Sequence, residues 1–216
     1  MRTADIRTRR FLTLVAAALT AMALTGCRIA TTTATDPPRS DTYRGDIATV
    51  VLNLDDVGAM QIGSTSAAIG VRVTGTDRDE VQVDRTMEYT DGDRPVERIA
   101  QTGDTLTITA RCPDDLAIGT PTCHADYEIQ VPYGTTVRAV NQEGDLTIED
   151  TRGEVEARSQ VGDIIVTVAP GGAGYAVTAS SQDGEATVDV PQDPGGVPIR
   201  AASDSGDVIV RTVRQG

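Results

Sequence analysis

The fold of this chain is decided by a twelve-residue segment, Val137-Arg-Ala-Val-Asn-Gln-Glu-Gly-Asp-Leu-Thr-Ile148, whose pattern occurs four times. Each copy has an aliphatic residue, an alanine two positions later, then Asn or Ser, Gln or Asp, a glycine, an acid and two alternating apolar residues. The copies begin at Val137, Val155, Val177 and Ile199, so their spacings are 18, 22 and 22 residues. Apolar residues at every second position are typical of β-strands that bury one face.

The middle of each copy predicts a tight turn between two short strands. Asn and Ser side chains form local hydrogen bonds to the backbone, and glycine adopts a positive φ without a Cβ clash. A fixed turn also fixes the register, because a shift of one residue would move Leu146 and Ile148 into solvent. We therefore expect stacked coils, in which equivalent residues of successive copies lie on one another.

The composition favours a narrow core of small aliphatic side chains. Tryptophan is absent, and the single phenylalanine, Phe11, lies in the N-terminal segment. A β-sandwich usually needs larger side chains to fill a gap of about 10 Å between its sheets. We predict an all-β, single-domain β-solenoid or β-helix of short stacked strands, with a β-sandwich as the alternative.

The first 26 residues have the features of an export signal. Four arginines precede an apolar run from Phe11 to Leu24, which is too short to be a convincing membrane-spanning helix. The run ends in Leu24-Thr-Gly-Cys27, which resembles the lipobox of bacterial lipoproteins. The resemblance implies that residues 1–26 are a lipoprotein signal peptide and that Cys27 becomes a lipid-modified N-terminus carrying a diacylglyceryl thioether and acyl chains such as palmitate. Thr8-Arg-Arg-Phe-Leu12 also resembles a twin-arginine signal that lacks one intervening residue, so the export route stays open.

Residues 27–44 are predicted to form a flexible, lipid-anchored tether. They are rich in Thr, Ser, Pro and Asp and contain few apolar residues. Two or more acyl chains make membrane attachment stable. We therefore expect the folded part to be held at the extracytoplasmic face of the cell membrane through Cys27, without spanning the membrane.

The folded domain is predicted to extend over residues 45–216, with a less regular part at 45–125 and regular repeats at 126–213. The less regular part would cap the stack or shield its edge. Alternating apolar residues predict five further strands, at 49–54, 68–74, 81–85, 105–110 and 126–131. A single helical turn is possible around residues 97–100.

Two cysteines remain once Cys27 is assigned to lipidation. Cys112 and Cys123 flank a turn-rich loop, and an even pair in an exported protein favours a disulfide, which would contribute about 2–3 kcal/mol. A metal site formed with His124, the single histidine, lacks a fourth ligand at suitable spacing. We therefore predict a disulfide, no metal and no cofactor.

The chain is strongly acidic, and its negative charge argues against two kinds of partner. Beyond Gly26 the chain has 15 basic and 31 acidic residues, a formal net charge of −16, and it contains no lysine. Such a surface argues against binding nucleic acid and against electrostatic docking onto anionic lipid. Solubility is the simplest reason for so many acids.

Four acids occupy the same position of the repeat and deserve separate treatment: Asp145, Asp163, Glu185 and Asp207. Stacked in register, they would form a ladder of carboxylates able to bind calcium or to hydrolyse a glycan. The preferred interpretation is that each acid starts a strand, points outward and aids solubility, with arginines such as Arg138, Arg158 and Arg200 offsetting the repulsion. Aromatic platforms for sugars are scarce, since the chain has five tyrosines and no tryptophan.

One family resemblance rests on the segment Val131-Pro-Tyr-Gly-Thr-Thr-Val137 and the Ser-x-x-Gly-Asp-apolar units that follow it. Together they resemble the bacterial family catalogued as putative adhesins, over roughly residues 45–213. The resemblance implies a non-enzymatic, extracytoplasmic β-solenoid. Together with the lipobox, the tether and the repeat, it leads to the hypothesis of a membrane-anchored domain that binds envelope proteins or cell-wall polymer. A glycan-active β-helix enzyme using the repeat acids and a purely structural spacer are the alternatives.

Overall fold

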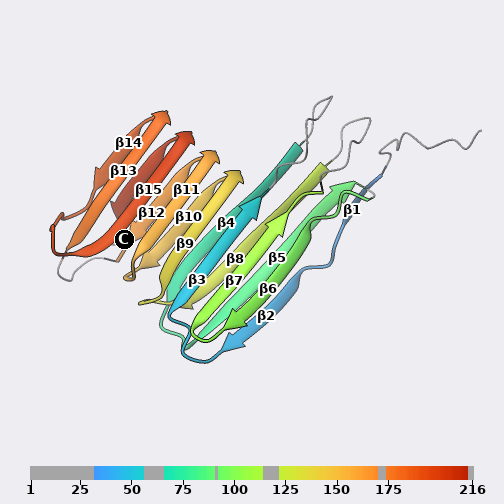
Figure 1. Cartoon of the computed structure of the whole chain (residues 1–216), viewed down its shortest axis with the longest axis horizontal. Coiled ribbons are helices and arrows are strands. Elements are labelled where there is room, and N and C mark those ends of the chain that lie inside the picture. The colour runs from blue at the N-terminus through green and yellow to red at the C-terminus, as the bar shows by residue number, and fades with distance from the viewer. Residues whose placement is uncertain (1–31, 56–65, 91, 114–121, 170–173, 214–216) are drawn as a thin grey trace, which may run out of the picture.

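The described part of the chain consists of β-strands and their connections, as the computed structural model shows (Figure 1). The structure describes residues 32–55, 66–90, 92–113, 122–169 and 174–213. These ranges contain no helix, and hence none long and apolar enough to cross a membrane. The prediction of an all-β chain is confirmed for them. The predicted signal peptide and Cys27 lie outside the described residues.

The strands form two sheets, which we call sheet I and sheet II. Sheet I has the order β1-β5-β8-β4-β10-β12-β16-β14, with β2 also paired to β5. Its strands are β1 (Thr33–Thr35), β2 (Arg39–Arg44), β4 (Ser66–Thr76), β5 (Glu80–Thr90), β8 (Thr122–Pro132), β10 (Leu146–Thr151), β12 (Ile164–Val168), β14 (Ala186–Asp189) and β16 (Val208–Thr212).

Sheet II has the order β13-β15-β11-β9-β3-β7-β6. Its strands are β3 (Thr49–Asp55), β6 (Val96–Thr102), β7 (Thr105–Arg111), β9 (Thr136–Glu143), β11 (Val155–Val161), β13 (Tyr175–Asp183) and β15 (Val197–Ser205). Most pairs in both sheets are parallel; the pairs of β5 with β1, β2 and β8, and of β6 with β7, are antiparallel. All five strands predicted before the repeats are present.

Each copy of the repeat forms one coil, with its first strand in sheet II and its second in sheet I. Neighbouring coils pair in parallel and in register, so that Val155 lies between Val137 and Ile199. Two further coils, β3–β4 and β7–β8, are built in the same way, each with its first strand in sheet II and its second in sheet I. Inward side chains of both sheets form one aliphatic core, in which Val155 and Ile164 are fully buried.

The order of the coils differs from the order of the sequence. In both sheets the strands of the fourth copy lie between those of the second and the third, so the third copy ends the stack. Likewise, the coil β3–β4 lies between β7–β8 and the first copy. The expectation that successive copies stack on one another is therefore correct for the first and second copies and wrong for the second and third.

The predicted tether of residues 27–44 is described from residue 32 onward, and there it contains strands β1 and β2, which corrects the prediction for this part. Strands β1 and β2 pair with the edge strand β5, from Thr33 opposite Thr90 to Arg44 opposite Glu80. Backbone hydrogen bonding to an open edge requires no apolar residues, and this is why the composition did not indicate it. A side-chain ion pair between Arg44 and Glu80, at 3.1 Å, adds to the pairing.

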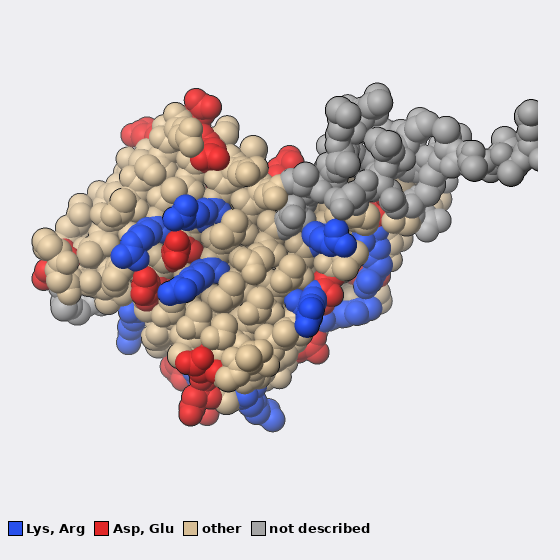
Figure 2. Space-filling view, viewed as in Figure 1, with Lys and Arg blue, Asp and Glu red and all other residues tan. Residues whose placement is uncertain are grey.

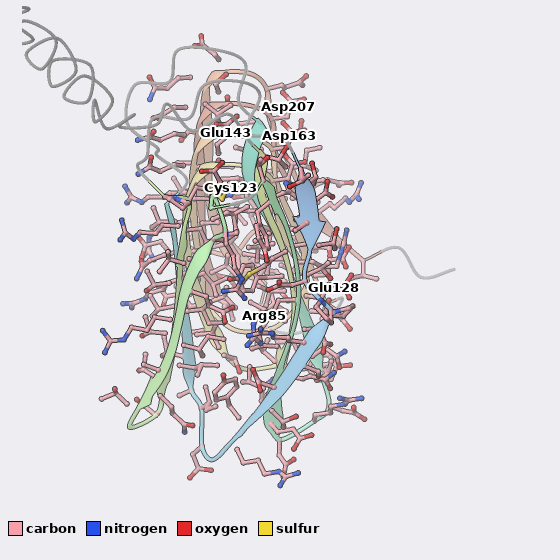
Figure 3. All side chains as sticks on the ribbon, turned by 90° about the vertical axis from the view of Figure 1, so that its right-hand side faces the viewer. Arg85, Cys123, Glu128, Glu143, Asp163 and Asp207 are labelled. Atoms are coloured by element: carbon pink, nitrogen blue, oxygen red, sulfur yellow. A yellow bond between two sulfur atoms is a disulfide. The ribbon has the colours of Figure 1, made fainter. Side chains whose placement is uncertain are left out.

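The segment at residues 97–100 also differs from expectation, because it belongs to strand β6 and not to a helical turn. Glu97 points inward there, to a polar cluster that closes this end of the core. Arg85, which lies between the two layers of strands in Figure 3, is 8% exposed. Its Nε lies 2.8 Å from a carboxylate oxygen of Glu97, and its Nη2 lies 2.7 Å from Asp41. Tyr127 donates a hydrogen bond to Glu97 at 2.9 Å.

The polar cluster makes stability depend on pH in the alkaline range. Burial, helped by the Glu97 carboxylate, raises the pKa of Tyr127 far above its ordinary value of about 10. The neutral phenol is therefore favoured in the folded state, and its contribution to stability is full below about pH 10 and declines at higher pH. We expect Tyr127→Phe to lose less stability between pH 8 and pH 11 than the parent, as measured by urea unfolding at both values. Equal losses would contradict this assignment.

Candidate functional site

The repeat acids form a ladder of hydrogen bonds at one end of the coils, where Figure 3 shows Asp163 and Asp207. The Oδ1 of Asp145 accepts the backbone N–H of Asp163 at 2.9 Å. The Oδ1 of Asp163 accepts the N–H of Asp207 at 2.8 Å, and that of Asp207 accepts the N–H of Glu185 at 2.9 Å. Each of these carboxylates therefore ties its own turn to the turn of the next coil.

A second ladder runs through the Asn and Ser positions of the repeat. Each side chain donates to a backbone carbonyl of the preceding coil in space: Asn141 to Ile69 (2.8 Å), Ser159 to Gly144 (3.5 Å), Ser203 to Gly162 (2.9 Å) and Ser181 to Gly206 (2.7 Å). The glycines are stacked closely, since a Cβ on Gly162 would lie 2.2 Å from the carbonyl oxygen of Gly144. The polar positions of the repeat thus hold successive turns together.

This geometry adds to the interpretation of the acids. The carboxylates lie in a ladder on the surface, as expected, and three of them also accept backbone N–H groups of the next coil. Two of the arginines expected to offset the charge of the repeat acids pair with other carboxylates. Arg158 pairs with Glu156 at 3.4 Å, and Arg200 pairs with Glu154 at 2.9 Å.

The ladder predicts different effects for two acids in the same repeat position. We expect Asp163→Ala to cost about 1 kcal/mol because the N–H of Asp207 loses its acceptor, and Asp163→Asn to cost less because an amide oxygen can accept the same bond. Glu185→Ala is the matched control: within the described residues no backbone N–H meets its carboxylate, and we expect no change. Urea unfolding of the three variants measures this. Equal losses for Asp163→Ala and Glu185→Ala would refute a structural role.

The predicted disulfide between Cys112 and Cys123 is present, with Cα atoms 6.0 Å apart. Both cysteines are buried, and their thiols are not available to a metal. The alternative of a metal site with His124 is therefore wrong. Among the described residues, no group of three His, Cys, Asp or Glu side chains is placed to hold a metal ion.

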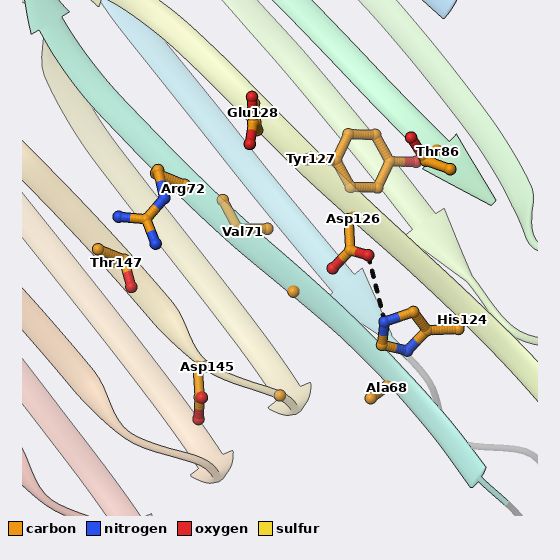
Figure 4. A pocket seen from close by; sticks show the side chains of 12 residues that line it. Ala68, Val71, Arg72, Thr86, His124, Asp126, Tyr127, Glu128, Asp145 and Thr147 are labelled. Atoms are coloured by element: carbon orange, nitrogen blue, oxygen red, sulfur yellow. Dashed lines mark ion pairs between the residues drawn. The ribbon is translucent and has the colours of Figure 1, made fainter. Parts of the chain in front are cut away.

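His124 instead belongs to a groove of about 640 Å³ on the outer face of sheet I (Figure 4). Its Nε2 lies 3.3 Å from Asp126. Arg72 on the neighbouring strand β4 pairs with Glu149 at 2.8 Å. The groove thus presents groups of both charges on a rigid sheet, where polar ligands can form directed hydrogen bonds and ion pairs.

The shape of the groove follows from strand length and from one glycine. Strands β4 and β8 are paired as far as Ser66 and Thr122, whereas β10 begins only at Leu146. The groove therefore lies at the step beside the turn before Leu146. Gly70 leaves room at its floor: a Cβ there would lie 2.8 Å from a carboxylate oxygen of Asp126.

The two outer faces differ in charge. Outward positions of sheet I carry the arginines Arg72 and Arg211 but more acids: Glu80, Asp84, Glu88, Asp126, Glu128, Glu149 and Asp189. Outward positions of sheet II carry arginines interspersed with acids: Arg98, Arg111, Arg138, Arg158 and Arg200, with Glu156 and Asp204. Figure 2 shows on one face how arginines and acids alternate over a mostly uncharged surface. The net charge of the chain therefore conceals two surfaces of different character.

Four residues of the groove were not predicted from the sequence: Gly70, Arg72, Asp126 and Glu128. A glycine inside a strand pattern marks a bulge or a close approach, and this signal was available at Gly70. The position of Asp126 beside Gly70 could not be predicted, because it depends on the pairing of β4 with β8.

Comparison with known proteins supports the fold alone. No protein-family profile matches the chain, and no curated protein matches it. A solved structure described as a putative cell adhesion protein from Clostridium sporogenes is similar over 82% of this chain and 100% of its own, with a TM-score of 0.50 and 10% identity. A second, described as a putative adhesin from Bacteroides fragilis, covers 82% and 97%, with 10% identity and a TM-score of 0.20, at which no likeness of fold is claimed.

Proposed function

We propose that this chain is a membrane-anchored, extracytoplasmic lipoprotein whose β-solenoid domain binds envelope proteins or cell-wall polymer in an adhesin-like role. The observation that carries the binding role is the groove over Gly70, which combines room for a ligand with Arg72 and the His124–Asp126 pair on a rigid sheet. The solved structure of similar fold is described as a putative cell adhesion protein, which supports the proposal by analogy of fold.

The solenoid description is supported by the way in which the coils are joined. Each repeat gives one strand to each sheet, and parallel neighbours stack Val on Val and Ala on Ala. A single coil cannot bury its apolar side chains without the neighbouring coils, which is the physical basis of repeat architectures. In this proposal the fold is a solenoid in which the third and fourth coils are exchanged; the two facing sheets are also compatible with the β-sandwich alternative.

The binding role is tested by filling the groove. The purified domain with the change Gly70→Val is compared with the parent for retention of cell-wall fractions and envelope proteins. Thr109→Val, on the outer face of sheet II, is the control because it places the same valine at an outward strand position away from the groove. We expect binding at least about tenfold weaker for Gly70→Val and unchanged for Thr109→Val.

Two results would contradict the binding role. One is the absence of any enriched partner for the parent protein. The other is hydrolysis of a glycan by the parent that is lost when Asp145, Asp163, Glu185 and Asp207 are replaced together while the fold is retained. That second result would support the glycan-active alternative. We propose against it because three of these carboxylates are engaged by backbone N–H groups.

The anchor is tested separately. Cells expressing the full chain are grown with labelled palmitate, and label and protein are followed in membrane fractions, with Cys27→Ser as the comparison. We expect the parent to be labelled and membrane-bound, and the variant to be unlabelled. Equal labelling of both proteins, or an unlabelled parent, would contradict lipidation at Cys27.

A further inference from the structure

The third copy of the repeat, β13–β14, leaves one end of the stack open. Within the described residues β13 pairs only with β15, and β14 only with β16, apart from one isolated bridge of Tyr175 to Gln192. At Tyr175 the edge of β13 is covered, since its N–H bonds to Pro191 and its C=O accepts the N–H of Asp193. Beyond it, within the described residues, the edges of β13 and β14 have no paired strand. The core side chains of this coil are also less covered than those further in: Val177, Ala179 and Val188 are partly exposed, and Ala186 is exposed.

Both hydrogen-bond ladders end at this coil, and in each ladder the last acceptor has no donor from a further coil within the described residues. In the inner coils, the glycine carbonyl accepts a side chain of the next coil, and the acid accepts its backbone N–H. In the described residues no further coil meets the carbonyl of Gly184 or the carboxylate of Glu185. The end coil is therefore built like an inner coil and not like a cap.

The opposite end shows what a protected edge looks like in this protein. There β6 carries Glu97 and Arg98, and the short strand β2 carries charges at both of its ends. Charged residues and short edge strands are the usual means of preventing edge-to-edge pairing. By contrast, β13 extends over nine residues, Tyr175-Ala-Val-Thr-Ala-Ser-Ser-Gln-Asp183, with no charge before the last and no proline.

We propose that the open end binds a second copy of this chain, with β13 of the two copies paired antiparallel about a two-fold axis near Ala179. In this register Val177 faces Ser181 of the other copy and Ala179 faces Ala179. Tyr175 lies outside the contact, because its backbone N–H and C=O are bonded to Pro191 and Asp193. Both sheets and the core then continue from one copy into the other, which is an isologous contact. The single acid of β14, Asp189, lies beside Arg211 of the neighbouring strand.

Stacking the open end onto the opposite end of another copy fits less well. It would place the uncharged edge of β13 against the charged edge of β6. It would also generate an unclosed filament, since both of its ends would remain available. The two-fold contact uses each open end once and is self-limiting. The proposal is independent of lipidation and of the groove.

The test places lysines on the edge without touching the core. Thr178 and Ser180 are exposed, outward residues of β13, and Thr178→Lys with Ser180→Lys would bring like charges together across the proposed contact. Thr107→Lys with Thr109→Lys is the matched control, on outward positions of β7. Sedimentation of the full chain in detergent gives the mass of each protein. We expect a dimer for the parent and the control, and a dissociation constant at least about 100-fold higher for the edge variant.

Hydrogen exchange provides a second readout. The amides of residues 175–183 should be exchanged more slowly at high than at low concentration of the parent, and this difference should vanish in the edge variant. A parent that is monomeric at every concentration, or a dimer indifferent to the lysines on β13, would overturn the proposal. A monomer whose β13 amides are already protected would indicate that another segment of the same chain covers the edge, which also overturns it.

Discussion

Gly162→Ala is expected to destabilise the protein by about 3–5 kcal/mol, a large part of the stability of a typical domain. The new Cβ would lie 2.2 Å from the carbonyl oxygen of Gly144 and 2.6 Å from its carbon. Both atoms belong to a backbone held in the ladder, so neither can move away as a flexible side chain would. Gly162 also has a φ of +141°, which strains any residue with a side chain.

The matched control for Gly162 is Gly103→Ala. Gly103 also has a positive φ, +60°, but a Cβ there would meet nothing within 4 Å. Gly103→Ala therefore has only the cost of placing a side chain at positive φ, which we expect to be about 1 kcal/mol. Urea unfolding of both variants separates the two contributions. If both lose the same stability, the close stacking of the turns is not what requires glycine.

The second large effect is expected at the polar cluster that closes the core. Glu97→Ala should cost about 3 kcal/mol, because it leaves the buried Arg85 with Asp41 as its remaining ion-pair partner and removes the acceptor of Tyr127. Two nitrogens of Arg85, Nε and Nη1, make no hydrogen bond, although Nε lies 2.8 Å from Glu97, so the side chain has little capacity to compensate. Thermal or urea unfolding measures the loss.

A surface ion pair provides the control for Glu97. Glu149 lies 2.8 Å from Arg72, a similar separation, but both side chains are more than one-third exposed. We expect Glu149→Ala to cost less than about 1 kcal/mol. A similar loss for the two glutamates would mean that burial of Arg85 does not control the energetics. Replacing Arg85 and Glu97 together by Met and Leu should restore part of the stability, since an apolar pair can fill a buried site.

Much of the fold follows from the local pattern of the sequence. Alternation around the turn that contains Gly144 predicts both strands of a coil and the face that each one buries, and the structure agrees at Leu146 and Ile148. The disulfide was predictable because two cysteines flank one loop in a chain whose first 26 residues predict export. These features depend on residues that are close in the sequence, so the pattern contains the information.

The order of the coils was not predictable for a physical reason. All four copies present Val or Ile and then Ala at the same stacking positions, so any order of coils pairs like with like. The structure places Ile199 between Val155 and Val177, but the reverse order would bury equivalent side chains. Strands β1 and β2 were missed because edge pairing through the backbone leaves little trace in composition. The groove depends on Gly70 and Asp126, which only the pairing of β4 with β8 brings together.

The reordered stack is tested most directly by cross-linking two pairs of cysteines in a Cys27→Ser background. Arg158 is the register partner of Ala202 in the fourth copy, and Ala202 is the partner of Ser180 in the third. Neighbouring strands are about 4.8 Å apart, within disulfide range, whereas strands separated by one coil are not. Mild oxidation should therefore join Arg158→Cys to Ala202→Cys and leave Arg158→Cys with Ser180→Cys unlinked. Linkage of the second pair and not the first would show that the coils follow the order of the sequence, and would contradict the structure described above.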